Sequence, residues 1–99
     1  MNEPMSQPML LLVTFDLSNA DLYRFETYEE TVLPLLKRHG AGLKWRVRSA
    51  DAAAEYHLLQ FPGHQALSDY RSDPERERLQ DDWISCGAIA TSVEVFDVS

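Results

Sequence analysis

The sequence predicts an α+β fold in which two helical regions cover one face of a four-stranded antiparallel sheet. Apolar residues recur at three- and four-residue steps over residues 20–39, which is the pattern of a long amphipathic helix. Strand-like runs surround it, and the chain changes pattern in the order strand, helix, strand, strand, helix, strand. With 99 residues, the chain has room for one such domain.

The first strand is predicted over residues 9–15, where the run MLLLVTF is almost entirely apolar. This run is too short for an ordinary helix, and its lack of alternation indicates a strand that is buried on both faces. Residues 1–8 are polar and contain two prolines, so we expect a flexible tail there and a single domain over residues 9–99.

The first helix carries the apolar stripe that the rest of the chain has to cover. Ser18 or Asn19 is the expected N-cap, and Gly40 can take the left-handed conformation that ends a helix. Pro34 removes the hydrogen bond to the carbonyl of Glu30, so we expect a bend there. The stripe consists of Leu22, Phe25, Tyr28, Val32, Leu35, Leu36 and His39.

Two further strands form a hairpin. Residues 43–48 alternate, which places Leu43, Trp45 and Val47 on one face and the basic side chains between them on the other. A small polar loop connects them to a third strand over residues 55–61.

The remaining chain predicts a short helix over residues 64–71 and a second start at Asp73, which can cap a helix with Pro74 in its first turn. Residues 88–98 have the β-branched pattern of a last strand. Because βαβ crossovers are right-handed in nearly all proteins, both helical regions lie on the same side of the sheet. This arrangement is the ferredoxin-like βαββαβ fold.

The predicted sheet has more apolar surface than its helices can cover. Soluble monomers rarely expose a large apolar patch, so a second copy packed face to face is the simplest cover. We therefore expect a homodimer through the open sheet face.

Composition disfavours several other partners. The chain has 16 acidic and 9 basic side chains, so its net charge of −7 would repel nucleic acid and anionic membranes. No run approaches the roughly 20 apolar residues of a membrane span. Cys86, the single cysteine, cannot form an intrachain disulfide and fits a reducing compartment, so we expect a cytoplasmic location.

Short motifs follow one another along the chain: Asp16 at the end of the first strand, Tyr28-Glu29, Val32-Leu33-Pro34, His39-Gly40, Glu55 with His57 and Leu59, Phe61-Pro62, Tyr70, and Asp73-Pro74-Glu75-Arg76. In this order they resemble a family of small bacterial domains of unknown function in the dimeric α/β-barrel superfamily. The resemblance covers residues 9–98 and implies a homodimer whose two sheets close into a barrel with the helices outside. The superfamily includes cofactor-independent oxygenases, isomerases, dehalogenase-like and haem-degrading enzymes. Ala20 departs from the pattern, because related chains often have proline there.

Two polar residues are candidates for chemistry. His57 has Glu55 two residues away on the same strand face, so it can act as a general base near neutral pH, with a satisfied interface histidine as the alternative. Asp16 is expected on the same side as Arg46 and Arg48, whose guanidinium groups would hold it ionised to orient a ligand. An ion-pair cluster inside the dimer barrel is the alternative for Asp16.

Aromatic side chains predict a pocket between the helices and the sheet, although ordinary core packing explains the same spacing. In such a pocket the rings would stack on a flat apolar ligand and the phenols would fix its orientation. The histidines show no metal-ligand spacing, so no metal is expected. No cofactor is expected either. The candidate ligand-binding residues are Tyr28, Trp45, Tyr70, Trp83 and Arg46.

Three functions remain open, and the sequence does not decide whether the chain is an enzyme. The leading hypothesis is a homodimeric, cofactor-free domain that binds a small apolar or aromatic ligand. The second is a cofactor-independent oxygenase or isomerase, which requires His57, Tyr28 and Asp16 to converge on one cavity. The third is a structural protein-interaction dimer.

Overall fold

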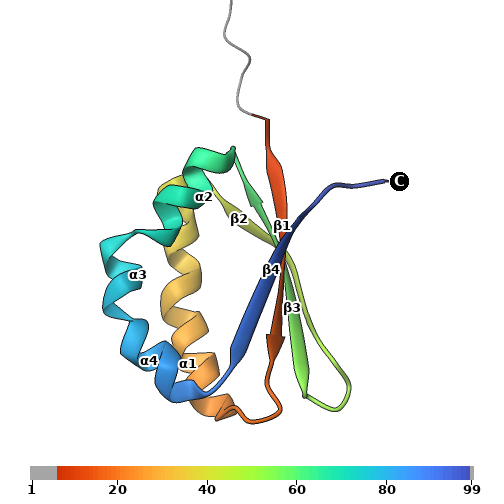
Figure 1. The fold of residues 1–99 in the computed structure, drawn as a ribbon, viewed down its shortest axis with the longest axis vertical. Coiled ribbons are helices and arrows are strands. Elements are labelled where there is room, and N and C mark those ends of the chain that lie inside the picture. The colour runs from red at the N-terminus through yellow and green to blue at the C-terminus, as the bar shows by residue number, and fades with distance from the viewer. Residues whose placement is uncertain (1–6, 99) are drawn as a thin grey trace, which may run out of the picture.

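The computed structural model describes residues 7–98 and shows four strands in one antiparallel sheet with all helices on one side (Figure 1). The strand order is β2-β3-β1-β4, which confirms the predicted ferredoxin-like fold. All but the last two positions of the tail predicted over residues 1–8 lie outside the described residues. The strands are β1 (Met9–Asp16), β2 (Gly42–Arg48), β3 (Ala54–Phe61) and β4 (Ile89–Val95). The helices are α1 (Leu22–Val32), the 3-10 helix η1 (Leu33–His39), α2 (His64–Arg71), α3 (Pro74–Arg78) and α4 (Gln80–Cys86).

The long amphipathic helix changes character next to Pro34. The α-helix ends at Val32, and the chain continues as a 3-10 helix through His39. Pro34 has no N–H to donate to the Glu30 carbonyl, which explains why regular α-helix does not continue here. Gly40 ends this segment with a φ of 69°, in the left-handed conformation that the sequence predicts.

The predicted N-cap of this helix is wrong. Asp21 is the N-cap, and its Oδ1 accepts a hydrogen bond from the Arg24 N–H at 3.1 Å. Ser18 instead donates its hydroxyl to Asp16, and Asn19 makes no capping bond to the helix. The helix therefore starts two or three residues later than the sequence pattern indicates.

The core consists of two apolar clusters beneath the helices. One surrounds Leu36, Phe61 and Tyr70, under η1 and α2. The other surrounds Phe15 and Phe25, under α1 and α4. Val13 packs against both clusters.

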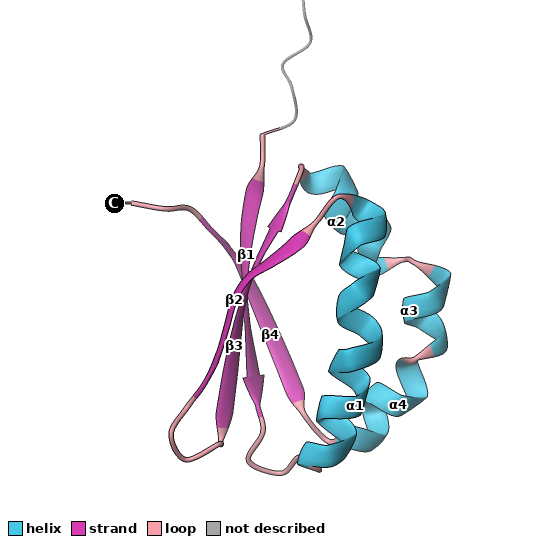
Figure 2. Ribbon diagram, turned by 180° about the vertical axis from the view of Figure 1, so that it is seen from behind, coloured by secondary structure: helices cyan, strands magenta, loops and turns pink. Residues whose placement is uncertain are grey.

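No helix of the described residues covers the opposite side of the sheet (Figure 2), and apolar side chains line it. The exposed fractions are 44% for Trp45, 50% for Val47, 62% for Ile89 and 56% for Val93. We call this surface the open face. It also includes Leu10, Leu12 and Leu58, which share its side of the sheet by strand register.

A bulge in β2 breaks the expected alternation. Leu43 pairs with Leu59, whereas Trp45 pairs with Leu58. Because adjacent residues of a strand point to opposite faces, Leu43 lies on the helix side and Trp45 on the open face. The prediction that both share a face is therefore wrong.

The helices of the described residues are too short or too polar to span a membrane.

Candidate ligand-binding site

A cavity of about 250 Å³ lies between the helices and the sheet. Residues of β1, β3 and β4 line one side, and residues of all four α-helices line the other. Two side-chain contacts connect α2 to the edge strand β4 beside it: Arg71 donates to the Ser92 hydroxyl at 3.3 Å, and His64 contacts Glu94 at 2.9 Å.

Aromatic rings form one continuous wall of this cavity. The Trp83 ring centroid lies 5.1 Å from that of Tyr28 and 6.0 Å from that of Phe15. The Phe15 ring in turn lies 4.6 Å from the His57 ring. Tyr70 lines the cavity from α2. The flat faces of these rings suit a planar ligand.

The structure brings together four of the residues that the sequence singles out. Tyr28, His57, Tyr70 and Trp83 all line the cavity. Trp45 does not, because the β2 bulge leaves it on the open face.

Two charged candidates also lie away from the cavity. Asp16 is exposed at the end of β1, where its Oδ1 accepts hydrogen bonds from the Ser18 hydroxyl and N–H, which lower its pKa. It pairs with Ala54, whereas Arg46 pairs with His57 on the helix side. The expectation that Asp16 lies beside Arg46 and Arg48 is therefore wrong.

Glu55 holds a buried ion-pair cluster next to the cavity. Its carboxylate lies 2.6 Å from Arg46 Nε, 2.6 Å from Arg48 Nε and 2.6 Å from His57 Nε2. Glu26 on α1 binds both guanidinium groups from the other side. Burial acts to raise the pKa of Glu55, but the hydrogen bonds outweigh it and hold that pKa below its usual value. Arg46 thus serves this cluster and is not part of the cavity lining.

His57 is held as a neutral base at the cavity wall. Its side chain is 2% exposed, and burial lowers its pKa although Glu55 opposes the shift. Because ionised Glu55 can only accept, the imidazole N–H lies on Nε2. Nδ1 is then the basic nitrogen of the ring.

Glu29 on α1 is a cavity residue that the sequence analysis missed. It is 2% exposed and lines the cavity. Burial raises the pKa of Glu29 to about 7. A sequence signal exists: Glu29 falls four residues after Phe25 and three before Val32, on the apolar stripe.

Arg76 on α3 is the second missed residue. Its guanidinium carbon lies 4.9 Å from the centre of the Tyr70 ring. Its Nε is buried and has no hydrogen-bond partner within residues 7–98. It is the one buried side-chain nitrogen or oxygen of the described residues for which this is so. Burial raises the pKa of Tyr70, and raises that of Tyr28 to about 12, so both phenols remain protonated donors at neutral pH.

The cavity therefore combines an apolar aromatic wall with a small set of polar groups. It offers a neutral imidazole, a carboxyl group that titrates near neutral pH, and a guanidinium with an open N–H. Within the described residues, no group of three or more His, Cys, Asp or Glu side chains is arranged to hold a metal ion.

The strand order and the helices on one side of the sheet define a ferredoxin-like α+β fold, as the sequence predicts. No protein-family profile matches the chain, and no curated protein sequence matches it. Solved structures do share its fold. The chain is similar to SnoaB, a cofactor-independent oxygenase from Streptomyces nogalater, with a TM-score of 0.77 and 10% identity over 95% of this chain and 96% of that one.

Two other solved structures have the same fold. PA3566 from Pseudomonas aeruginosa has a TM-score of 0.74 and 13% identity, and the match covers 98% of this chain and 100% of that one. Rv0793 from Mycobacterium tuberculosis has a TM-score of 0.67 and 11% identity, with 94% and 99% covered. At these identities the likeness establishes the fold alone.

Proposed function

We propose that this chain is a homodimeric domain that binds a small, flat ligand in the cavity between helices and sheet. The observation that carries this proposal is the cavity of about 250 Å³, walled by the rings of Phe15, Tyr28, His57 and Trp83. Pockets for drug-sized ligands measure roughly 300–1,000 Å³. The size therefore suits a ligand of one or two rings.

A thermal-shift screen of apolar aromatic and hydroxy-aromatic compounds tests this proposal. A ligand present at about 100 times its Kd stabilises the native state by about 2.7 kcal/mol, which raises Tm by on the order of 10 °C for a domain of this size. Quenching of Trp83 fluorescence provides a second measurement, because this indole lies in the cavity wall.

Two variants that each replace an alanine with phenylalanine distinguish binding in the cavity from binding at the surface. Ala90 lines the cavity from the edge strand and is exposed, so Ala90→Phe should fill the opening without crowding the core. Ala50→Phe, in the exposed β2–β3 loop, is the matched control. Binding should be lost in Ala90→Phe and kept in Ala50→Phe. Equal binding by both, or no response to any compound, would contradict the proposal.

The homodimer is the second part of the proposal, and the open face supports it. Trp45, Val47, Ile89 and Val93 leave about half or more of their surfaces in water, and a contiguous apolar patch of this kind is typical of an interface. A second copy packed on this face would leave both cavities on the outer, helical sides. The buried thiol of Cys86 fits the cytoplasmic location that we include in the proposal.

An enzyme is the second candidate function, favoured by the contact of His57 with Glu55 at the cavity wall. The hypothesis that His57, Tyr28 and Asp16 converge fails for Asp16, but Glu29 supplies a carboxyl group in the cavity. A neutral His57 can remove a proton from a bound carbon acid, as an isomerase or a cofactor-independent oxygenase would require.

Proton removal can be measured separately from binding. Deuterium from the solvent should enter a bound carbon acid, and the exchange should be lost in His57→Gln. His64→Gln is the control, because His64 is 71% exposed on α2. Oxygen consumption without added cofactor would favour the oxygenase. Binding without exchange or oxygen uptake would leave a binding protein and exclude this candidate.

A further inference from the structure

The proposed ligand cavity contains a buried guanidinium N–H of Arg76 that has no hydrogen-bond partner among the described residues, and the buried carboxyl group of Glu29. We propose that the cavity takes a planar aromatic carboxylate, that the Arg76 guanidinium anchors its anionic group, and that Glu29 takes up a proton when this anion binds. This inference rests on the proposed function and names the ligand class for the same site.

The first argument concerns Arg76. A buried N–H without a partner is rare in folded proteins and costs free energy. The Arg76 Nε is such a group, and its residue lines the cavity. Tyr70 packs against the guanidinium from one side, which holds it in place. An acceptor oxygen of a ligand would satisfy this N–H, and a carboxylate makes the strongest such bond.

The second argument concerns Glu29. Its side chain is buried and lines the same cavity. Four charged groups act on it electrostatically: Glu26 on its own helix, Arg46 on β2, Glu55 on β3 and Arg76 on α3. His57 on β3 lines the same cavity. Glu29 and Arg76 influence each other electrostatically but form no ion pair. A ligand group therefore has room to lie between them.

The third argument is the charge of the cavity. Among the described residues, Arg76 and Arg71 bring two positive charges to the lining, and Glu29 is the one carboxylate. Arg46 and Arg48 both form ion pairs with Glu55 and Glu26, which balance their positive charges. An anion near Glu29 disfavours the ionised form of that carboxyl group, so Glu29 becomes protonated and can donate a hydrogen bond to the ligand. The aromatic wall holds the ring system.

The first experiment compares 2-naphthoate with naphthalene-2-carboxamide, which has the same shape but no charge. Titration calorimetry on the unmodified protein should show the acid binding about 10- to 100-fold more tightly, as a charge-assisted hydrogen bond predicts. Equal affinity for the two compounds would overturn the inference.

The second experiment measures the proton. Just above pH 7, binding of 2-naphthoate should take up a fraction of a proton, seen as different apparent binding enthalpies in phosphate and Tris buffers. Glu29→Gln should abolish this difference and still bind the acid. Proton uptake that is unchanged in Glu29→Gln, or absent from the unmodified protein, would overturn the role of Glu29.

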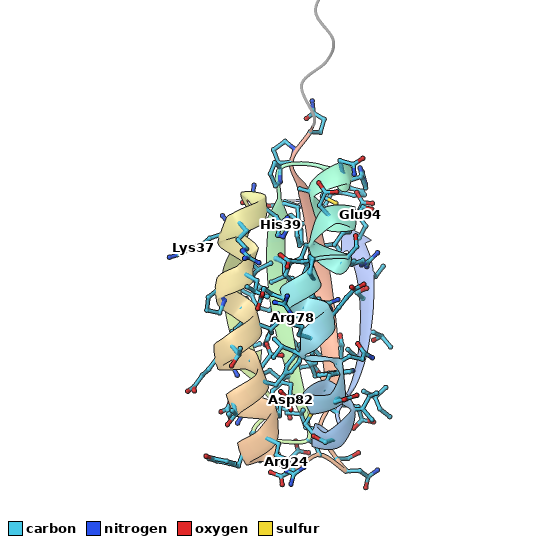
Figure 3. The ribbon with its side chains drawn as sticks, turned by 90° about the vertical axis from the view of Figure 1, so that its left-hand side faces the viewer. Arg24, Lys37, His39, Arg78, Asp82 and Glu94 are labelled. Carbon is cyan, nitrogen blue, oxygen red and sulfur yellow. The ribbon has the colours of Figure 1, made fainter. Side chains whose placement is uncertain are left out.

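The third experiment tests the anchor. Arg76→Gln should bind the acid and the amide equally well, whereas Arg76→Lys should regain part of the preference. Arg78→Gln is the matched control, because Arg78 lies on the outer side of the same helix and is 68% exposed (Figure 3). An acid preference that Arg76→Gln retains in full would overturn the anchor.

These outcomes separate the inference from the proposed function. If neutral aromatic compounds bind and the acid has no advantage, the cavity is a ligand site but the assigned ligand class is wrong. If neither compound binds, the proposed function itself fails. The comparisons on the unmodified protein decide the ligand class even if Arg76→Gln does not fold.

Discussion

The Nε2 atom of His57 lies 2.6 Å from an oxygen of Glu55, and both side chains are almost completely buried. The same carboxylate binds two arginines of β2, so it connects the cavity wall to the edge of the sheet. Loss of this carboxylate should therefore affect both stability and the state of His57.

Glu55→Gln should destabilise the fold. It leaves two guanidinium groups partly buried without their main acceptor, and breaking a buried ion pair on one side costs about 3–5 kcal/mol. Urea unfolding should show this loss. Glu26→Gln is the control: Glu26 binds the same arginines but is 44% exposed, so its loss should cost under about 1 kcal/mol. Equal losses for the two variants would contradict this account.

Glu29→Gln should stabilise the protein at neutral pH. In the folded state the pKa of Glu29 is about 7, against an ordinary glutamate value of 4.5 in the unfolded chain. Between these values the unfolded chain ionises Glu29 and the folded chain does not, so the group lowers stability as pH rises through this window. The resulting difference in the free energy of unfolding between Glu29→Gln and the unmodified protein is at most about 3 kcal/mol at pH 7 and vanishes near pH 4. Urea unfolding of both proteins at the two pH values checks this, and a constant difference would contradict it.

Asp73 should make the fold sensitive to acid. Its carboxylate accepts from His39 at 2.7 Å, from the Glu75 N–H at 2.9 Å and from Arg38 at 3.1 Å. These contacts lower its pKa to about 2. Its contribution to stability is therefore complete above about pH 4, the unfolded value, and is lost as pH falls toward 2. Asp73→Asn should have a lower Tm than the unmodified protein at pH 5. Between about pH 4 and pH 2 its Tm should fall less than that of the unmodified protein, as followed by circular dichroism.

Gly87→Ala should destabilise the contact between the end of α4 and the start of α1. Gly87 has a φ of 80°, and an added Cβ would lie 2.9 Å from the Asn19 carbonyl oxygen. Such a substitution costs more than about 1 kcal/mol. Gly42→Ala is the control, because a Cβ there meets nothing within 4 Å. Thermal unfolding of the two variants should differ clearly, and similar Tm values would contradict the close approach.

Val93→Lys should prevent the proposed dimer. Val93 pairs with Leu12 on the open face and is 56% exposed, so a charge there would be buried against the second copy. Ile84→Lys, at a 65% exposed position on α4, changes the opposite side of the molecule. Sedimentation at micromolar concentration should give single-chain mass for Val93→Lys and twice that mass for Ile84→Lys. Single-chain mass for the unmodified protein would contradict the dimer.

The sequence predicts the fold well because its strongest signals are local. The apolar run of β1, the stripe of α1 and the Asp73-Pro74 helix start each depend on residues close together in the chain. The effect of Pro34 follows from the chemistry of proline alone. The N-cap was missed by two to three residues, because Ser18, Asn19 and Asp21 are all good capping residues.

The site was harder to predict because it depends on strand register. The two-residue alternation shows which residues share a face within one strand. It does not show whether Asp16 of β1 and Arg46 of β2 share a face of the sheet, because that depends on how both strands pair with β3. The bulge that moves Trp45 relative to Leu43 has the same cause.

Glu29 and Arg76 were missed for a different reason. Charged residues on helices are mostly solvated, so a pattern search counts them as surface. A carboxylate at a stripe position, as Glu29 is, is the exception that a search for buried charge would find. Arg76 has no such signal, because its burial depends on how α3 packs over Tyr70.

Every described wall of the cavity comes from a single chain and lies on the helical side of the sheet. Pairing through the other face would leave both cavities complete and separate. Saturation should therefore reach one ligand per polypeptide, with a Hill coefficient of about one, and occupancy of one site should not depend on the state of its twin.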